Sequence, residues 1–203
     1  PLGTGGVRPP FRSKLQTSRE ATMKFLTSRN RFASLQEVSG GSIRTGGVGG
    51  GATGGNGRQP RLSDAQREAV GFAGEWLAYK WLERLHGDDF SPGSWMSAYR
   101  ELTFPGAGDD SLGWDFQVPT RKGLLMYEVK TSQGEGGQFE LGETQVLAAQ
   151  LNARNGRWRL LVITDVLNEN RRIRMLRNPF DPQSRGQYAF VGQGLRLRYY
   201  TSK

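Results

Sequence analysis

Three charged side chains interrupt two apolar, strand-like runs in the segment GWDFQVPTRKGLLMYEVKTS, residues 113–132. Asp115 lies in the first run, and Glu128 and Lys130 lie two residues apart in the second. Burying an unpaired charge costs several kcal/mol or forces the group to neutralise, so this pattern needs a chemical reason. Side chains alternate along a strand, which puts Glu128 and Lys130 on one side. Adjacent strands lie about 4.8 Å apart, so Asp115 can converge with Glu128.

Two carboxylates beside one amine suit a hard divalent cation such as Mg²⁺ or Mn²⁺. Mg²⁺ takes oxygen ligands from one or two carboxylates and completes its shell with waters and phosphate oxygens. We expect Asp115 and Glu128 as ligands, with the carbonyl of Val129 as a third. Lys130, one pleat further along, would orient or deprotonate the attacking water and neutralise charge that develops on a phosphate. The alternative is the charged face of an edge strand, on which Glu128 and Lys130 only form an ion pair.

A long helix precedes these strands, in RLSDAQREAVGFAGEWLAYKWLERLHG, residues 61–87. Ser63 with Gln66 three residues on forms a capping box, and Gly87 is a suitable stop after the last apolar residue. Glu75 lies at the margin of the core face, beside Gly74, where another element can approach closely. From these residues alone, Glu75 is either a solvated helix carboxylate or part of the site. The apolar residues recur at helical spacing and predict one broad core face, formed by Ala69, Val70, Ala73, Trp76, Leu77, Trp81 and Leu85.

The apolar period changes from helical to strand-like after the first helix. Strands are expected at 97–104, 114–118 and 124–132, with a loop at 105–113 and a tight reversal at 119–123. A second helix is expected at 142–156, with Gly156 after its last turn. Further strands follow at 158–167 and 172–177, and one or two more in 188–200. This order predicts an α/β fold with a mixed sheet flanked by helices.

Composition excludes several classes of site. The chain of 203 residues fits one or two domains, and its mean hydropathy of −0.60 is that of a soluble chain with no membrane partner. The absence of Cys excludes disulfides, thiolate zinc sites and a catalytic thiol. The one histidine, His86, excludes a two-histidine zinc motif. We expect an intracellular, cytoplasmic protein, with association with the nucleoid left open.

The basic character of the chain lies in its N-terminal part. Residues 1–61 hold ten Lys and Arg against two acids, a net charge of +8 out of +9 for the whole chain. A Gly-rich stretch, 40–60, is typical of a flexible linker. We therefore divide the chain into a basic, Gly-rich flexible arm, 1–61, and a folded domain, 62–203. The arm either attracts nucleic-acid phosphate, with Arg61 at its end, or serves as a charged linker.

The motifs resemble the PD-(D/E)xK nuclease superfamily, which has the restriction-endonuclease-like fold. More narrowly, GFAGEWLAYKWL, GWDFQV, YEVKTSQGEGGQFELGETQ and LLVITDVLNENRRIRMLRNPFD together look like the NO VEIN C-terminal domain family. The resemblance covers roughly residues 64–182. It implies an αβββαβ core and metal-dependent phosphodiester cleavage.

Four residues match the acidic and basic positions of that superfamily. Asp115, Glu128 and Lys130 fall on its signature, and Glu75 matches the acidic residue that many members carry on the first core helix. Trp114 stands where the signature has Pro, a common variation that leaves the chemistry intact. In the narrower family the fold is better assured than the activity.

Further polar residues are weaker candidates for nucleic-acid contacts. Gln145, on the first turn of the second helix, would orient a water or a phosphate, or is an exposed helix residue. Arg172 and Arg174 alternate on one strand and would line a phosphate groove, or are ordinary surface residues.

Three functional classes compete. The first is a metal-dependent nuclease acting on DNA, as a module of a larger, defence-type system. The others are a non-catalytic nucleic-acid-binding module and an interaction domain that binds other subunits. The sequence does not distinguish DNA from RNA, or endonuclease from exonuclease.

Overall fold

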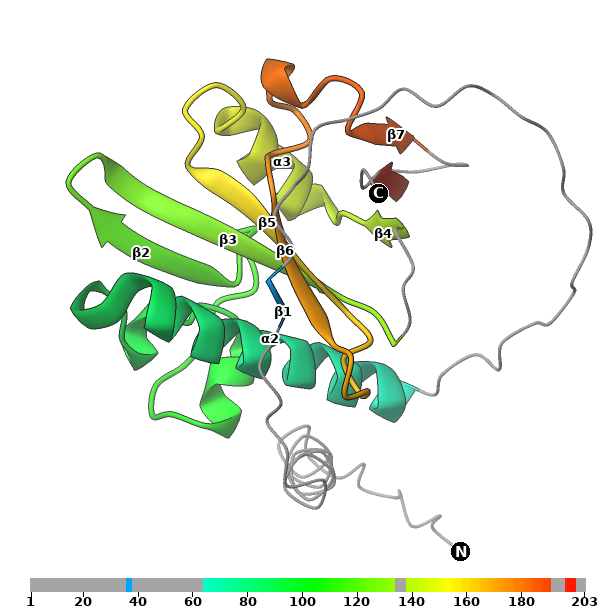
Figure 1. The fold of residues 1–203 in the computed structure, drawn as a ribbon. Coiled ribbons are helices and arrows are strands. Elements are labelled where there is room, and N and C mark those ends of the chain that lie inside the picture. Colours follow the sequence, from blue (N-terminus) through cyan, green and yellow to red (C-terminus); the bar gives the residue numbers. More distant parts are fainter. Residues whose placement is uncertain (1–35, 38–63, 134–137, 191–195, 200–203) are drawn as a thin grey trace, which may run out of the picture.

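The computed structural model describes residues 36–37, 64–133, 138–190 and 196–199 (Figure 1). Within them lie two α-helices, four 3₁₀ helices and strands of two sheets. The helices are α2 (Asp64–His86) and α3 (Glu143–Leu151), and the 3₁₀ helices are η1 (Gly87–Asp89), η2 (Pro92–Ser94), η3 (Ala98–Leu102) and η4 (Pro182–Ser184). The strands are β1 (Gln36–Glu37), β2 (Phe116–Thr120), β3 (Gly123–Thr131), β4 (Gln138–Glu140), β5 (Trp158–Thr164), β6 (Arg172–Leu176), β7 (Tyr188–Phe190) and β8 (Arg196–Tyr199).

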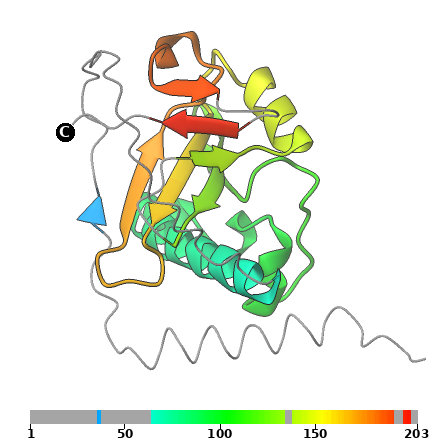
Figure 2. The ribbon, with the colours of Figure 1, turned by 90° about the vertical axis from the view of Figure 1, so that its right-hand side faces the viewer.

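The main sheet is mixed, as expected. Its strand order is β1-β6-β5-β3-β2, and β2 with β3 and β5 with β6 run antiparallel. β3 with β5 and β1 with β6 run parallel. A second, antiparallel sheet has the order β4-β8-β7 (Figure 2). β3 lies between β5 and β2, so it is not an edge strand of the main sheet, although β2 pairs with it only as far as Tyr127.

Helices flank the main sheet, and two apolar clusters fill the layers (Figure 1). α2 crosses one face, where Tyr127 and Val129 of β3 join the larger cluster. α3 and the second sheet cover the other face, where Met126 of β3 joins the smaller cluster. Alternation along β3 therefore directs Glu128 and Lys130 away from α2.

The first helix begins and ends where its sequence predicts. α2 starts at Asp64, directly after the expected cap, Ser63, which lies outside the described residues. Gly87 has a φ of 56°, the left-handed conformation that glycine adopts readily at a helix end. Leu85, expected in the core, is 49% exposed. The buried face of α2 includes Tyr79 and Leu82 instead.

The expected strand at 97–104 is wrong, because this segment forms η3 and a bend. Its aromatic side chains pack against α2 instead of alternating across a sheet. Tyr99 meets Phe72 edge-on at 6.0 Å, and Phe104 lies 5.1 Å from the ring of Tyr79. The alternating aromatic residues of this segment therefore reflect packing against α2 and not a strand. Three strands still separate α2 from α3, but the third is β4, which belongs to the second sheet.

Other boundaries also differ from the expected ones. Pairing of β2 with β3 continues to Thr120 and Gly123, which leaves only two turn residues. α3 ends at Leu151 instead of Gly156, since the side-chain amide of Asn152 donates to the Ala148 carbonyl at 2.9 Å. The Gly-rich loop before α3 contains β4, which pairs with β8 some sixty residues later.

Most of the arm lies outside the described residues, including the expected linker at 40–60 and Arg61. Its described part is β1, which pairs in parallel with Arg172 and Ile173 of β6. Among the described helices, none is both long and apolar enough to cross a bilayer.

Candidate functional site

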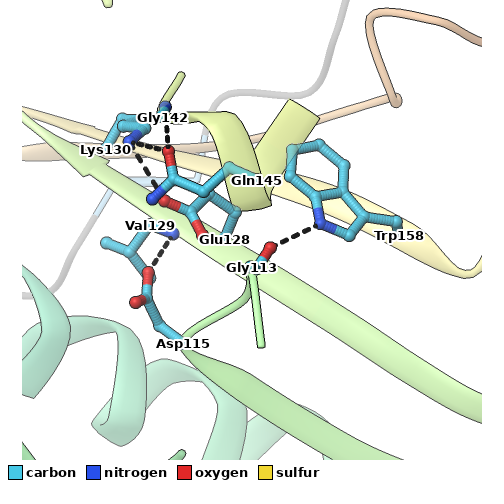
Figure 3. A network of polar contacts seen from close by, with 8 residues as sticks. All are labelled: Gly113, Asp115, Glu128, Val129, Lys130, Gly142, Gln145 and Trp158. Carbon is cyan, nitrogen blue, oxygen red and sulfur yellow. Dashed lines mark hydrogen bonds and ion pairs between the residues drawn. The ribbon is translucent and has the colours of Figure 1, made fainter. Parts of the chain in front are cut away.

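The hairpin β2–β3 brings Asp115 opposite Glu128, as the sequence predicts. Asp115 precedes Phe116, which pairs with Tyr127, and the Asp115 amide donates to the Tyr127 carbonyl at 2.9 Å. The Val129 amide donates to Asp115 Oδ2 at 2.7 Å (Figure 3). This hydrogen bond fixes the rotamer of the Asp115 carboxylate, and the Val129 carbonyl as a metal ligand stays a prediction.

Gly113 fixes the position of the chain just before β2. Gly113 has a φ of 82°, and a Cβ there would lie 2.4 Å from the Thr144 carbonyl oxygen of α3. The buried indole of Trp158 donates to the Gly113 carbonyl at 3.0 Å. Only glycine permits both the left-handed backbone and this close approach. The start of β2 is therefore fixed against α3, with Trp114 and Asp115 directly after the anchor.

Glu128, Lys130 and Gln145 form one polar network (Figure 3). Lys130 Nζ lies 3.0 Å from Glu128 Oε1 and donates to Gln145 Oε1 at 2.8 Å. Gln145 Oε1 also accepts from the amide of Gly142, the N-cap of α3, at 2.9 Å. Gln145 is half-buried, so the alternative of an exposed helix residue is wrong. The network links β3 to the start of α3.

Glu128 is the most deeply buried acid of the site. The residue is 1% exposed, and its Oε2 has no hydrogen-bond partner among the described residues. The Lys130 side chain keeps 20% of its surface exposed. One carboxylate oxygen is therefore paired with Lys130, and the other is a buried acceptor that is left unsatisfied.

Glu75 comes from α2, and it is 7% exposed, so the solvated alternative is wrong. Its Oε2 accepts from the Trp95 indole at 2.7 Å and from the hydroxyl of Ser97. The neighbouring Gly74 lets α2 approach β3, since a Cβ at Gly74 would overlap the side chain of Thr131. The expected close approach beside Glu75 is confirmed.

A cavity of about 310 Å³ opens onto Asp115 and Glu128. Two aromatic residues, Tyr99 and Trp114, line it, together with two further acids, Glu68 and Asp110. The remaining lining residues are Ala98, Gly113 and Gln145. Lys130 contacts two lining residues without lining the cavity itself, and Glu75 does not line it either.

The three carboxylates have raised pKa values. Burial, then repulsion by Asp115, raises the pKa of Glu128 well above its ordinary value, although Lys130 opposes the shift. Burial and Asp115 likewise raise the pKa of Glu75, against the hydrogen bonds from Ser97 and Trp95. Burial raises the pKa of Asp115 to about 6, and the Val129 amide and Lys130 limit that rise. Burial and like charge both disfavour joint ionisation.

Arg172 and Arg174 do not join this site. They lie on β6, two strands away from β3, and Arg174 and Lys130 are both paired with Val162 of β5. Val162, which is buried in the smaller apolar cluster, therefore lies between the two basic positions in the sheet. Neither arginine lines the cavity.

Sequence reasoning missed the residues that come from the segment before β2. Trp95 and Ser97 hold Glu75, and Tyr99 and Asp110 line the cavity. Asp110 belongs to an acidic pair in the loop at 105–113, but the sequence of a loop does not predict where its side chains point. The sequence pattern places Tyr99 in a strand, and therefore does not predict that it lines the cavity.

The site offers two carboxylates to a cation. Asp115 and Glu128 both line the cavity, and Glu128 Oε2 is an unsatisfied acceptor of the hard type that Mg²⁺ prefers. No three His, Cys, Asp or Glu side chains gather into a metal-binding group within the described parts of the chain. The residues therefore fit a cation that takes most of its ligands from water and substrate.

No protein-family model, curated protein or solved structure matches this chain.

Proposed function

We propose that this chain is a metal-dependent nuclease that hydrolyses phosphodiester bonds of DNA, on a restriction-endonuclease-like fold. The observation that supports it is the buried, unsatisfied Glu128 Oε2 at a cavity that it shares with Asp115. An unsatisfied buried acceptor is destabilising by about 1–3 kcal/mol. A cation at that position would remove this cost and supply the charge that a phosphate needs.

In this proposal Asp115 and Glu128 hold Mg²⁺ or Mn²⁺, with the carbonyl of Val129 as a further ligand. The cation would polarise a phosphoryl oxygen and activate water. Lys130, in contact with Glu128 at 3.0 Å, opposes the rise in the pKa of Glu128 and so favours its ionised form. Its partly exposed ammonium is also able to neutralise charge that develops on the phosphate. Gln145 holds Lys130 in place, and Glu75 is coupled electrostatically to Asp115.

The basic arm supplies affinity for DNA in this proposal. The folded part carries little net charge, whereas residues 1–61 carry +8. Phosphate contacts by Lys and Arg provide most non-specific binding energy. The arm would therefore recruit the substrate, with other subunits of a larger assembly as additional partners.

A second candidate is a non-catalytic nucleic-acid-binding or interaction module on the same fold. One observation favours it. Glu75 has two hydrogen-bond donors, and Glu128 already has Lys130, so the site holds together partly without a cation. In that case Asp115, Glu128 and Lys130 would serve the fold and not hydrolysis.

Cleavage assays with isosteric variants separate the two candidates. The full chain is incubated with linear and circular DNA in Mg²⁺ or Mn²⁺, and with EDTA as the metal-free control. We expect metal-dependent cleavage that Asp115→Asn, Glu128→Gln and Lys130→Met each abolish. Glu140→Gln and Lys122→Ala change exposed groups of the same types and should stay active. Cleavage that persists in EDTA, or in the Lys130→Met variant, would refute the mechanism.

A further inference from the structure

The cavity has the size of a small-ligand pocket and does not have room for a nucleic-acid duplex. Its volume of about 310 Å³ is at the low end of small-ligand pockets, which span about 300–1,000 Å³. The carboxylates that would hold the cation lie in its wall, and Glu128 is buried. A reacting phosphate must therefore come to the cavity together with the nucleotide attached to it.

Two aromatic side chains are held in the cavity wall. The Trp114 indole donates to Gln117 Oε1 at 3.3 Å, which fixes the plane of the ring. The Tyr99 ring packs edge-on against Phe72. Fixed aromatic rings are platforms on which unstacked bases stack, with little dependence on sequence.

The charges of the wall favour a base over a phosphate. Among the described residues that line the cavity, none is Lys or Arg, and two acids, Glu68 and Asp110, lie there beyond the carboxylates of the proposed metal site. Acids repel phosphate, but they accept hydrogen bonds from the amino groups of a base edge. Gln145 Oε1 is engaged by Lys130 and Gly142, which leaves its amide NH₂ as the donor toward a ligand.

From this arrangement we infer that the cavity accepts one unstacked nucleotide, so that the substrate is single-stranded or frayed nucleic acid instead of intact duplex. The inference rests on the proposed function of the site. Trp114 is the main stacking residue, Tyr99 is a second wall, and Glu68 and Asp110 contact the edge of the base. An intact duplex would first have to unpair one nucleotide, which makes it the weaker ligand.

Binding without turnover tests this inference. The full chain carries Glu128→Gln, which keeps the shape of the cavity and removes the proposed catalysis. A fluorescein-labelled 12-nucleotide strand and the blunt duplex of the same sequence are titrated by anisotropy. Salt at roughly 0.3 M weakens the contribution of the arm, because phosphate contacts fall steeply with salt. We expect the single strand to bind at least about tenfold more tightly than the duplex.

Variants of Trp114 separate stacking from packing. Trp114→Leu keeps an apolar side chain against the smaller cluster, which Trp114 partly covers, but has no aromatic face. Trp114→Phe keeps the face. We expect about a tenfold loss of single-strand affinity in the Leu variant and less than about a threefold loss in the Phe variant. Phe190→Ala removes an exposed aromatic of β7 outside the cavity and should have no effect.

The two proposals fail in different ways. Equal affinity for strand and duplex, no measurable binding, or equal effects of Leu and Phe at position 114 would overturn the nucleotide pocket, whatever the wild type cleaves. Preferential, Trp114-dependent binding without cleavage by the wild type in Mg²⁺ or Mn²⁺ would uphold the pocket and refute the nuclease. Melting curves of each variant confirm that the compared proteins are folded.

Discussion

Replacing Asp115 with Asn should stabilise the metal-free protein at neutral pH and above. The pKa of Asp115 rises from its ordinary value of 3.8 to about 6, mainly because the carboxylate is buried. An acid whose pKa is higher in the folded state favours folding below the unfolded pKa. That contribution is lost as the pH rises through the folded pKa. Two pKa units at about 1.36 kcal/mol each give a cost of roughly 3 kcal/mol when Asp115 is ionised.

Asparagine removes the ionisation and keeps an oxygen to accept the Val129 amide. Some of the cost disappears when water enters the cavity, so we expect Asp115→Asn to raise the free energy of unfolding by about 1–3 kcal/mol at pH 8. This corresponds to a rise in Tm of about 5 °C for a domain of this size. The gain should shrink between pH 6 and pH 4, where the folded Asp115 is already neutral.

Thermal and urea unfolding of the full chain in EDTA, followed by circular dichroism from pH 4 to pH 8, measures this difference. Asp88→Asn, which changes an exposed side chain in η1, is the control and should leave the free energy of unfolding unchanged. An Asp115→Asn variant that is no more stable than the wild type at pH 8 would refute the electrostatic argument. A gain of equal size at pH 4 would refute it as well, because a packing effect does not titrate.

Three further predictions concern the elements around the site. Asp115→Asn should lower the pKa of Glu75, because repulsion by Asp115 contributes to its rise, and an NMR titration detects the change; an unchanged pKa would show that the two carboxylates do not interact. Gly74→Ala should destabilise the fold by about 1–3 kcal/mol in urea unfolding through its clash with Thr131, and Thr131→Ala should rescue part of the loss. Deleting residues 1–60, which also removes β1 from the edge of β6, should reduce the slope of log affinity for DNA against log salt; an equal slope would reassign the arm to partner binding.

Local patterns sufficed for the elements that carry the site. The sequence of α2 carries its own capping signals and a helical apolar period. Both are local patterns, so the two ends of the helix can be predicted without knowing its neighbours. The β2–β3 hairpin joins residues close in the chain through a short turn. Asp115 and Glu128 therefore lie opposite one another as predicted. The alternation of side chains alone placed Lys130 beside Glu128.

Long-range contacts determined what the sequence did not reveal. Tyr99 and Phe104 alternate in a way that suits a strand, but their rings pack on α2, and that tertiary contact makes the segment helical. β4 exists because it pairs with β8, which a local pattern cannot indicate. Trp95 and Ser97 reach Glu75 from an irregular segment some twenty residues away, so the support of that carboxylate was not visible.

The charge balance of the site helps to distinguish the nuclease from a non-catalytic binding or interaction module. Three carboxylates have raised pKa values, and Lys130 opposes the shift only at Asp115 and Glu128. Each shift is a cost to the folded state above the pKa of that group. Hydrogen bonds offset this cost at Glu75, and the Val129 amide offsets part of it at Asp115. At Glu128 one oxygen remains buried without a donor from the described part of the chain. A module that only packs and binds would be more stable with a neutral isostere there. A site that holds a cation needs the charge, so its stability should rise with added Mg²⁺ or Mn²⁺ and lose that response in Glu128→Gln.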